Sequence, residues 1–257
     1  MSTMDVTYLP QANALPAREV RAEPSPWGFW GSLGWGLFAM ATGMVAAFIY
    51  TMIWMLTHQL RLANPQDPSF STAAGIATLS APLIMLAVAV KIRKFSLRDY
   101  FALNGFARRD LVLGIAGLIG LIVVFSGIET LLGIDGGSKQ VEATYRAAKA
   151  AGVLPLLWLS VVVVAPVTEE LFFRGFLHRG WAPSWLGVAG TIVVTSAVWA
   201  LLHQQYNALG ILLIFAMGLI FGWMRQRSGS TSLPIVLHMF NNLLATVFVT
   251  VNVEWLG

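Results

Sequence analysis

Long apolar stretches alternate with short polar segments along most of this 257-residue chain. Seven of the stretches are long enough to cross a bilayer as helices, because about 20 apolar residues span a hydrocarbon core of about 30 Å. They lie at 29–56, 72–90, 111–134, 153–180, 184–203, 208–224 and 233–252. The pattern predicts an all-α fold, a polytopic transmembrane helix bundle of about seven spans.

Lys and Arg are distributed unequally between the two sides that seven spans define. Because these residues concentrate in cytoplasmic loops, their distribution predicts a cytoplasmic N-terminus and an external C-terminus. In this orientation the cytoplasmic side holds Arg18, Arg21, Lys91, Arg93, Lys94, Arg98, Arg108, Arg109, Arg174, Arg179, Arg225 and Arg227, and the outer side holds Arg61, Lys139, Arg146 and Lys149. The bias explains the basic balance of the chain, so we expect the lipid bilayer as a partner and no nucleic acid.

Composition supports the membrane assignment, because 57% of the residues are hydrophobic and 11% are charged, against about 25% charged in soluble domains. The absence of cysteine excludes disulfides and thiolate sites. Together with short loops and the charge bias, it indicates a multi-pass protein of a bacterial inner membrane. Segment 1–28 is polar and Pro-rich, which predicts a disordered cytoplasmic tail. Residues 29–152 are predicted to form N-terminal membrane helices and interfacial loops.

Two adjacent carboxylates and a cation interrupt the stretch 153–180. Ionised side chains in hydrocarbon cost several kcal/mol unless they are paired or solvated, so Glu169, Glu170 and Arg174 are candidates for chemistry. Glu170 precedes Arg174 by four residues, which is the favourable order for an ion pair on one helix face. Glu169 is rotated by about 100° and has Phe173 at i+4, so it is left free to act.

Three more polar groups, His203, His238 and Asn242, lie in later apolar stretches. A helix hairpin that turns near 182–185 places Glu169 and His203 at similar depth, each about 25 Å of helix from the turn. His238 lies only about 8 Å of helix beyond the start of the last stretch. Either segment 228–234 therefore dips inward, or the helix ends and tilts differ from these boundaries.

Other residues in these stretches receive structural interpretations. His178 is expected to be solvated at the cytoplasmic end of its helix. The small residues Gly114, Gly117 and Gly120, and the pair Gly218 and Gly222, indicate seams of close helix packing.

Three motifs in order carry a family resemblance: Glu-Glu-x-x-x-Arg at 169–174, Trp-x-x-x-His at 199–203 and His-x-x-x-Asn at 238–242. They resemble the CAAX prenyl endoprotease and bacteriocin-processing (CPBP, or Abi) family of intramembrane proteases. The second motif departs from the family in one place, since Trp199 stands where Phe is usual. The resemblance covers about 153–252 and implies that this region is the catalytic helix core.

The resemblance implies an intramembrane endopeptidase that acts on a membrane-associated protein or peptide. Glu169 and His203 would activate water, His238 and Asn242 would stabilise the oxyanion, and Glu170 would pair with Arg174. We favour a metal-free mechanism without a cofactor. The alternative is a catalytic zinc held by Glu169, His203 and His238.

Two other function classes would use the same buried polar residues. A transporter would relay protons through intramembrane Glu and His, but it predicts paired halves, and 29–134 contains no counterpart of the Glu-Glu motif. A non-catalytic membrane scaffold would bind peptide segments without cleaving them. The intact motifs favour the protease over both alternatives.

Overall fold

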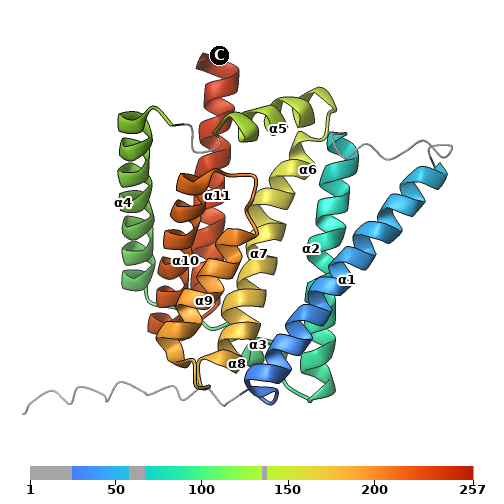
Figure 1. Ribbon diagram of the computed structural model, residues 1–257, viewed down its shortest axis with the longest axis vertical. Helices are drawn as coiled ribbons and strands as arrows, with labels where there is room; N and C mark the ends of the chain where they lie inside the picture. Colours follow the sequence, from blue (N-terminus) through green and yellow to red (C-terminus); the bar gives the residue numbers. More distant parts are fainter. Residues whose placement is uncertain (1–24, 58–66, 135–137, 257) are drawn as a thin grey trace, which may run out of the picture.

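The computed structural model describes residues 25–57, 67–134 and 138–256. The predicted all-α transmembrane bundle is confirmed, since the described residues form helices and include no strand. Long helices run up and down beside one another, with the first described residues at one end of the bundle and the C-terminus at the other (Figure 1). Most of the predicted tail, residues 1–24, lies outside the described residues.

Six of the described helices are long and apolar enough to cross a membrane. They are α1 (Gly28–Thr57), α2 (Pro68–Ile92), α4 (Arg108–Leu132), a composite helix at Leu154–Trp181, α10 (Ala208–Ser228), and α11 (Ser232–Val251), which continues into η3 (Asn252–Leu256). The predicted stretch 184–203 forms α9 (Gly187–Leu201), whose 15 residues rise about 22 Å and so fall short of a bilayer core of about 30 Å. The number of crossings and the orientation stay predictions.

In the hairpin of α9 and α10, two residues mark where α10 begins and ends. Asn207 caps α10 by accepting a hydrogen bond from the Gly210 amide, and Gly229 ends α10 in the left-handed region at φ 66°. The turn between α9 and α10, which contains His203, lies lower in the bundle than the upper ends of α4 and α6 (Leu154–Leu159) (Figure 1). This turn therefore brings a polar loop toward the middle of the bundle.

The composite helix contains two π-helical segments within one continuous rod. After α6 come η1 (Ser160–Val164), α7 (Ala165–Glu170), η2 (Leu171–Leu177) and α8 (His178–Trp181). In η1 the Ala165 amide donates to the Ser160 carbonyl, five residues earlier. Pro166 has no amide hydrogen, so the matching bond to the Val161 carbonyl is not available within the helix. The freed carbonyl instead accepts a hydrogen bond from Asn242 of α11 at 2.9 Å.

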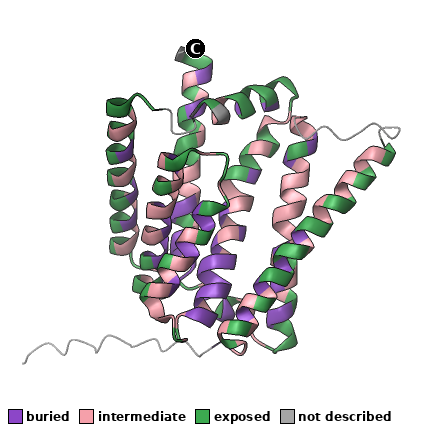
Figure 2. Ribbon diagram, viewed as in Figure 1, coloured by how far each residue is buried: buried purple, intermediate pink, exposed green. Residues whose placement is uncertain are grey.

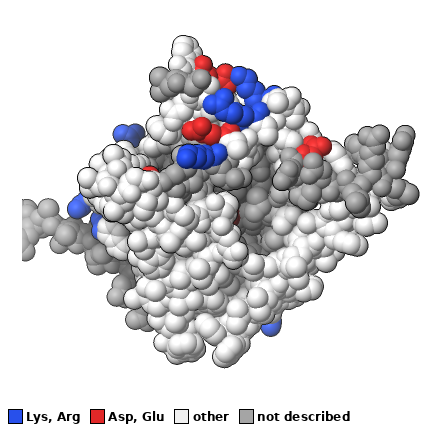
Figure 3. Space-filling model, turned by 45° about the horizontal axis from the view of Figure 1, so that its top comes forward, with Lys and Arg blue, Asp and Glu red and all other residues white. Residues whose placement is uncertain are grey.

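Buried residues concentrate in the lower half of the bundle, around α7, η2 and α8 (Figure 2). Phe172, Phe173 and Phe176 of η2 are among the buried core residues. Charged atoms gather near the end where α5 (Ser138–Ala150) crosses, whereas most of the visible flank is uncharged (Figure 3). This distribution fits a protein whose sides face lipid.

The glycine seams of the sequence are packing contacts at some positions and not at others. A Cβ at Gly218 or Gly222 would lie 2.8 Å from Ser196 or Ile192 of α9, so the α9–α10 contact depends on these glycines. A Cβ at Gly114 would lie 2.4 Å from Leu237 of α11. On the same α4 stripe, a Cβ at Gly120 would meet no atom within 4 Å, so this glycine makes no comparable contact.

Candidate active site

The predicted ion pair between Glu170 and Arg174 is present at the centre of the bundle. Arg174 Nη1 donates to Glu170 Oε1 at 2.9 Å, and the two side chains are 1% and 0% exposed. Arg174 Nη2 also donates to the carbonyl of Gly218 at 3.1 Å, and its guanidinium lies 4.9 Å from the ring centroid of Trp199. The pair thus joins the composite helix to α9 and α10.

His238 of α11 lies beside both glutamates. Its Nδ1 is 3.0 Å from Glu170 Oε1, and its Nε2 is 4.0 Å from Glu169 Oε2. Because a carboxylate oxygen accepts, Nδ1 carries the hydrogen of this bond and Nε2 is directed toward Glu169. The ring also stacks on Phe221, with centroids 5.1 Å apart.

The inward course of segment 228–234 explains how His238 reaches this depth. Ser230 and Thr231 are fully buried, although they directly precede the start of α11. The Ser230 hydroxyl donates to the carbonyl of Asn104, and the Thr231 amide donates to the carbonyl of Ala102. This packing is what the first of the two alternatives from the sequence requires, and the choice between them stays a prediction.

Glu169 differs from Glu170 in exposure and in partners. Its side chain is 20% exposed, and its Oε2 accepts a hydrogen bond from the indole nitrogen of Trp199 at 2.5 Å. Across the described residues, neither Lys nor Arg forms an ion pair with Glu169. The structure thus separates the two carboxylates into one that is neutralised by a cation and one that is accessible.

His203 lies close to this cluster but makes no hydrogen bond with Glu169 within the described part of the chain. Its Nδ1 is 2.8 Å from the carbonyl of Trp199, and its ring centroid is 5.2 Å from that of Trp199. A carbonyl only accepts, so Nδ1 carries the hydrogen, and in the neutral ring Nε2 then has the lone pair. Both groups contact Trp199, so Glu169 and His203 lie near each other, as expected from the sequence.

Asn242 is one turn beyond His238 on α11. One hydrogen of its side-chain amide is donated to the Val161 carbonyl. Its Oδ1 accepts a hydrogen bond from the side-chain amide of Asn241 at 3.2 Å. A side-chain amide has two hydrogens, so one remains for another acceptor. Asn242 therefore has a structural role, and its predicted role as an oxyanion donor stays a prediction.

Glu169, His203 and His238 are the ligands named for the alternative zinc mechanism, and the dependence on metal stays a prediction. Within residues 25–57, 67–134 and 138–256, no three His, Asp or Glu side chains lie together in a way that could hold a metal ion. His203 and His238 each use Nδ1 for a hydrogen bond to the protein, which leaves Nε2 of each ring available.

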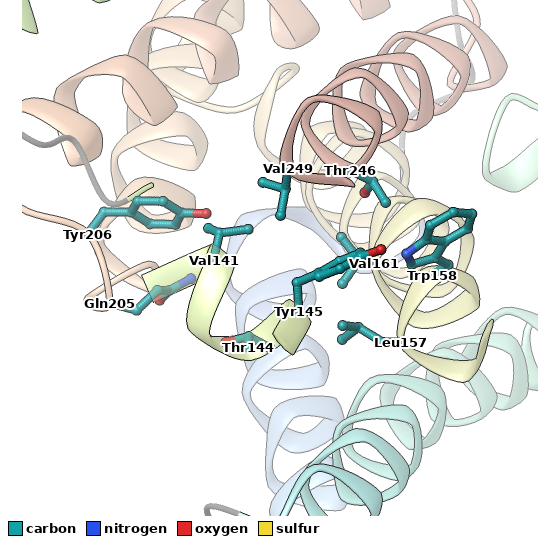
Figure 4. Close-up of a pocket in the computed structure, with 10 residues that line it drawn as sticks. All are labelled: Val141, Thr144, Tyr145, Leu157, Trp158, Val161, Gln205, Tyr206, Thr246 and Val249. Atoms are coloured by element: carbon teal, nitrogen blue, oxygen red, sulfur yellow. The ribbon is translucent and has the colours of Figure 1, made fainter. Parts of the chain in front are cut away.

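A cavity of about 270 Å³ adjoins the polar cluster (Figure 4). Side chains from α5, the composite helix, the α9–α10 turn and α11 line it: Val141, Thr144, Tyr145, Leu157, Trp158, Val161, Gln205, Tyr206, Thr246 and Val249. Val161 is the residue whose carbonyl binds Asn242, and the Tyr206 amide donates to the His203 carbonyl. Burial raises the pKa of Tyr206, so its phenol stays neutral. Two residues of the cavity lining are thus hydrogen-bonded to the predicted site residues Asn242 and His203, which do not line the cavity themselves.

Two residues differ from their sequence interpretation. His178, expected to be solvated, is 5% exposed because α1 and the core aromatics cover the lower end of the composite helix. Trp199 entered the sequence analysis only as a departure from the usual Phe, and its indole N–H donates a hydrogen bond to the accessible Glu169. The sequence signal for this contact was the position of Trp199 one helical turn before His203, together with the capacity of an indole N–H to donate a hydrogen bond.

Comparison with known proteins yields one family and two relatives. Residues 151–244, which contain all six predicted site residues, match the family described as Type II CAAX prenyl endopeptidase Rce1-like. The chain is 33% identical over 144 residues to an uncharacterized 24.3 kDa protein of Escherichia coli. The aligned region covers 52% of this chain and 64% of that protein. The chain is also 27% identical over 126 residues to the membrane-embedded CAAX protease MroQ of Staphylococcus aureus (strain USA300). This second aligned region covers 47% of the chain and 50% of that protein. The matches therefore span less than two thirds of either relative, and no solved structure matches the chain.

Proposed function

We propose that this chain, whose residues 151–244 belong to the Rce1-like family of type II CAAX prenyl endopeptidases, is a membrane-embedded endopeptidase. Its substrate would be a membrane-associated protein or peptide, and its location a bacterial inner membrane. The observation that carries the proposal is the division between the carboxylates. Glu170 is fully buried against Arg174, whereas Glu169 is 20% exposed and lacks a Lys or Arg partner among the described residues.

Glu169 is proposed as the base. It takes a proton from a water molecule as the water oxygen forms a bond with the carbonyl carbon of the substrate. The lone pair on His203 Nε2 accepts a hydrogen bond from the same water and orients it. When the tetrahedral intermediate collapses, the C–N bond breaks and protonated Glu169 returns the proton to the leaving amine. The base is thereby regenerated.

The oxyanion is proposed to bind Asn242 and His238. Asn242 would donate the amide hydrogen that Val161 does not use. His238 can donate from Nε2 only when both ring nitrogens carry hydrogen, because Nδ1 donates to Glu170. The proposed steps use the side chains of the chain and no metal, as favoured from the sequence, and the chelation experiment below tests this choice.

The cavity next to His203 and Asn242 is proposed to receive the substrate segment beside the scissile bond. Most of its lining side chains are apolar or aromatic, while the Gln205 amide and the Thr246 hydroxyl oxygen add polar atoms for an extended backbone. An amide in such a setting loses its water partners, so these groups would compensate for part of that loss. A membrane-associated peptide has both the apolar side chains and the backbone groups that this lining requires.

The proposal is tested with the full chain in lipid nanodiscs and a set of quenched fluorescent peptides. Each peptide is supplied with a prenylated C-terminal cysteine and in unmodified form, and cleavage products are identified by mass spectrometry. Glu169→Gln keeps the side-chain shape and removes the base, so cleavage should fall below detection. Glu129→Gln makes the same chemical change on α4, away from the cluster, and should cleave at the wild-type rate. Equal cleavage by wild type and Glu169→Gln would refute the assignment of the base.

A further inference from the structure

Trp199 is the residue through which Glu169 and His203 are connected. Its indole nitrogen donates to Glu169 Oε2 at 2.5 Å, and its backbone carbonyl accepts from His203 Nδ1 at 2.8 Å. The two proposed water-activating groups share no hydrogen bond with each other in the described structure. Their relative placement therefore depends on one residue of α9.

We infer that Trp199 is a positioning residue that sets the orientation of both groups at once, an inference that rests on the proposed endopeptidase function. The indole holds one carboxylate oxygen of Glu169 and leaves the other to receive a proton from water. The carbonyl holds His203 in the state with hydrogen on Nδ1, which directs the lone pair of Nε2 away from α9. Phenylalanine at this position would keep the backbone carbonyl but would lose the bond to Glu169.

The surroundings of Trp199 keep its ring in one place. The residue is 3% exposed, so the indole N–H has no water to bind and depends on Glu169 as its acceptor. The rings of Phe221 and His238 lie 5.8 and 5.2 Å from its ring, measured between centroids, and the Arg174 guanidinium covers it at 4.9 Å. Because these groups confine the Trp199 ring, it cannot turn toward another acceptor without displacing the ion pair of Glu170 and Arg174.

This arrangement gives Glu169 a fixed partner, although no Lys or Arg of the described residues forms an ion pair with it. A partly exposed glutamate without an ion pair has several rotamers, and most of them would point its carboxylate away from the water that it must deprotonate. A misplacement of about 1 Å at a reacting group can reduce the rate about 10²-fold. We therefore expect Trp199→Phe to lower kcat about 10²-fold while KM stays within twofold, since Trp199 does not line the substrate cavity.

The first arm of the test measures kcat and KM for Trp199→Phe in lipid nanodiscs. The matched control is Trp223→Phe on α10, the same substitution at a residue that is 48% exposed and outside the cluster. The control should retain wild-type kcat and KM. An unchanged kcat in Trp199→Phe would overturn the positioning role, and so would a loss confined to KM.

The second arm needs no activity and follows the hydrogen bond itself. The chain is labelled with ¹⁵N at its tryptophan indoles, and the Trp199 signal is identified by its loss in Trp199→Phe. Replacing the carboxylate with a neutral amide in Glu169→Gln should shift the Trp199 indole proton upfield and leave the Trp223 signal in place. An unmoved Trp199 signal would overturn the inference. An inactive wild type would instead refute the proposed function, and the indole signal would still decide whether Trp199 holds Glu169.

Discussion

Removing the charge of Glu170 should destabilise the protein far more than the same change at Glu169. Arg174 is 1% exposed and has Glu170 as its hydrogen-bonded anion at 2.9 Å, so Glu170→Gln deprives a buried guanidinium of its paired carboxylate. Breaking a buried pair by removing one partner costs about 3–5 kcal/mol. A loss of that size lowers the ratio of folded to unfolded protein by about 10²- to 10⁴-fold.

The expected effect at Glu169 is smaller because its carboxylate is partly exposed and interacts with a neutral indole. Gln at this position still offers an oxygen to Trp199, so Glu169→Gln should cost about 1 kcal/mol or less. Both variants replace a carboxylate with an amide at neighbouring positions of one helix. The comparison therefore isolates the contribution of the cation.

Reversible unfolding in mixed micelles, driven by sodium dodecyl sulfate and followed by tryptophan fluorescence, measures both free energies of unfolding. A second variant separates charge from shape: Glu170→Gln combined with Arg174→Met removes both charges and should recover much of the single-variant loss. Equal losses in Glu170→Gln and Glu169→Gln would refute the reasoning. A double variant no more stable than Glu170→Gln would show that the ion pair is not the source of the loss.

Three further outcomes are expected. Asn242→Ala should retain measurable cleavage, reduced about 10²- to 10³-fold as for the loss of one oxyanion donor. Wild-type cleavage should persist after strong chelation, and activity that is lost on chelation and restored by zinc would contradict the metal-free mechanism. Gly114→Ala should lower thermal stability, because its Cβ would lie 2.4 Å from a side chain of α11, whereas Gly120→Ala on the same helix should not; equal melting temperatures would contradict this. Reporter fusions should place loop 91–110 in the cytoplasm and Glu254 outside, and a cytoplasmic Glu254 would mean that the span count is wrong.

Much of the fold follows from local rules that the sequence carries. The apolar stretches predict the membrane helices because helix formation satisfies every backbone group in lipid. The bond between Glu170 and Arg174 follows from their spacing of four residues on one helix. The α9–α10 contact is indicated by Gly218 and Gly222, since small residues let helices approach closely.

Hydrogen bonds between distant residues could not be predicted in the same way, because local periodicity carries no information about which helices become neighbours. Trp199 and Glu169 are 30 positions apart, and Asn242 and Val161 are 81 apart. Any proline removes a hydrogen bond of its own helix, but only the packing of α11 decided which group takes the place of the Pro166 amide.

The sequence alone therefore determined the helical membrane fold, the membership of the polar residues in one ordered set of motifs, and the pairing of Glu170 with Arg174. The tertiary structure decided that α9 is short, that His178 is buried, and that the free glutamate binds an indole. The physical reason is the range of the interactions. Helix formation and i, i+4 pairing act within a few residues, whereas burial and side-chain hydrogen bonding depend on which helices pack together.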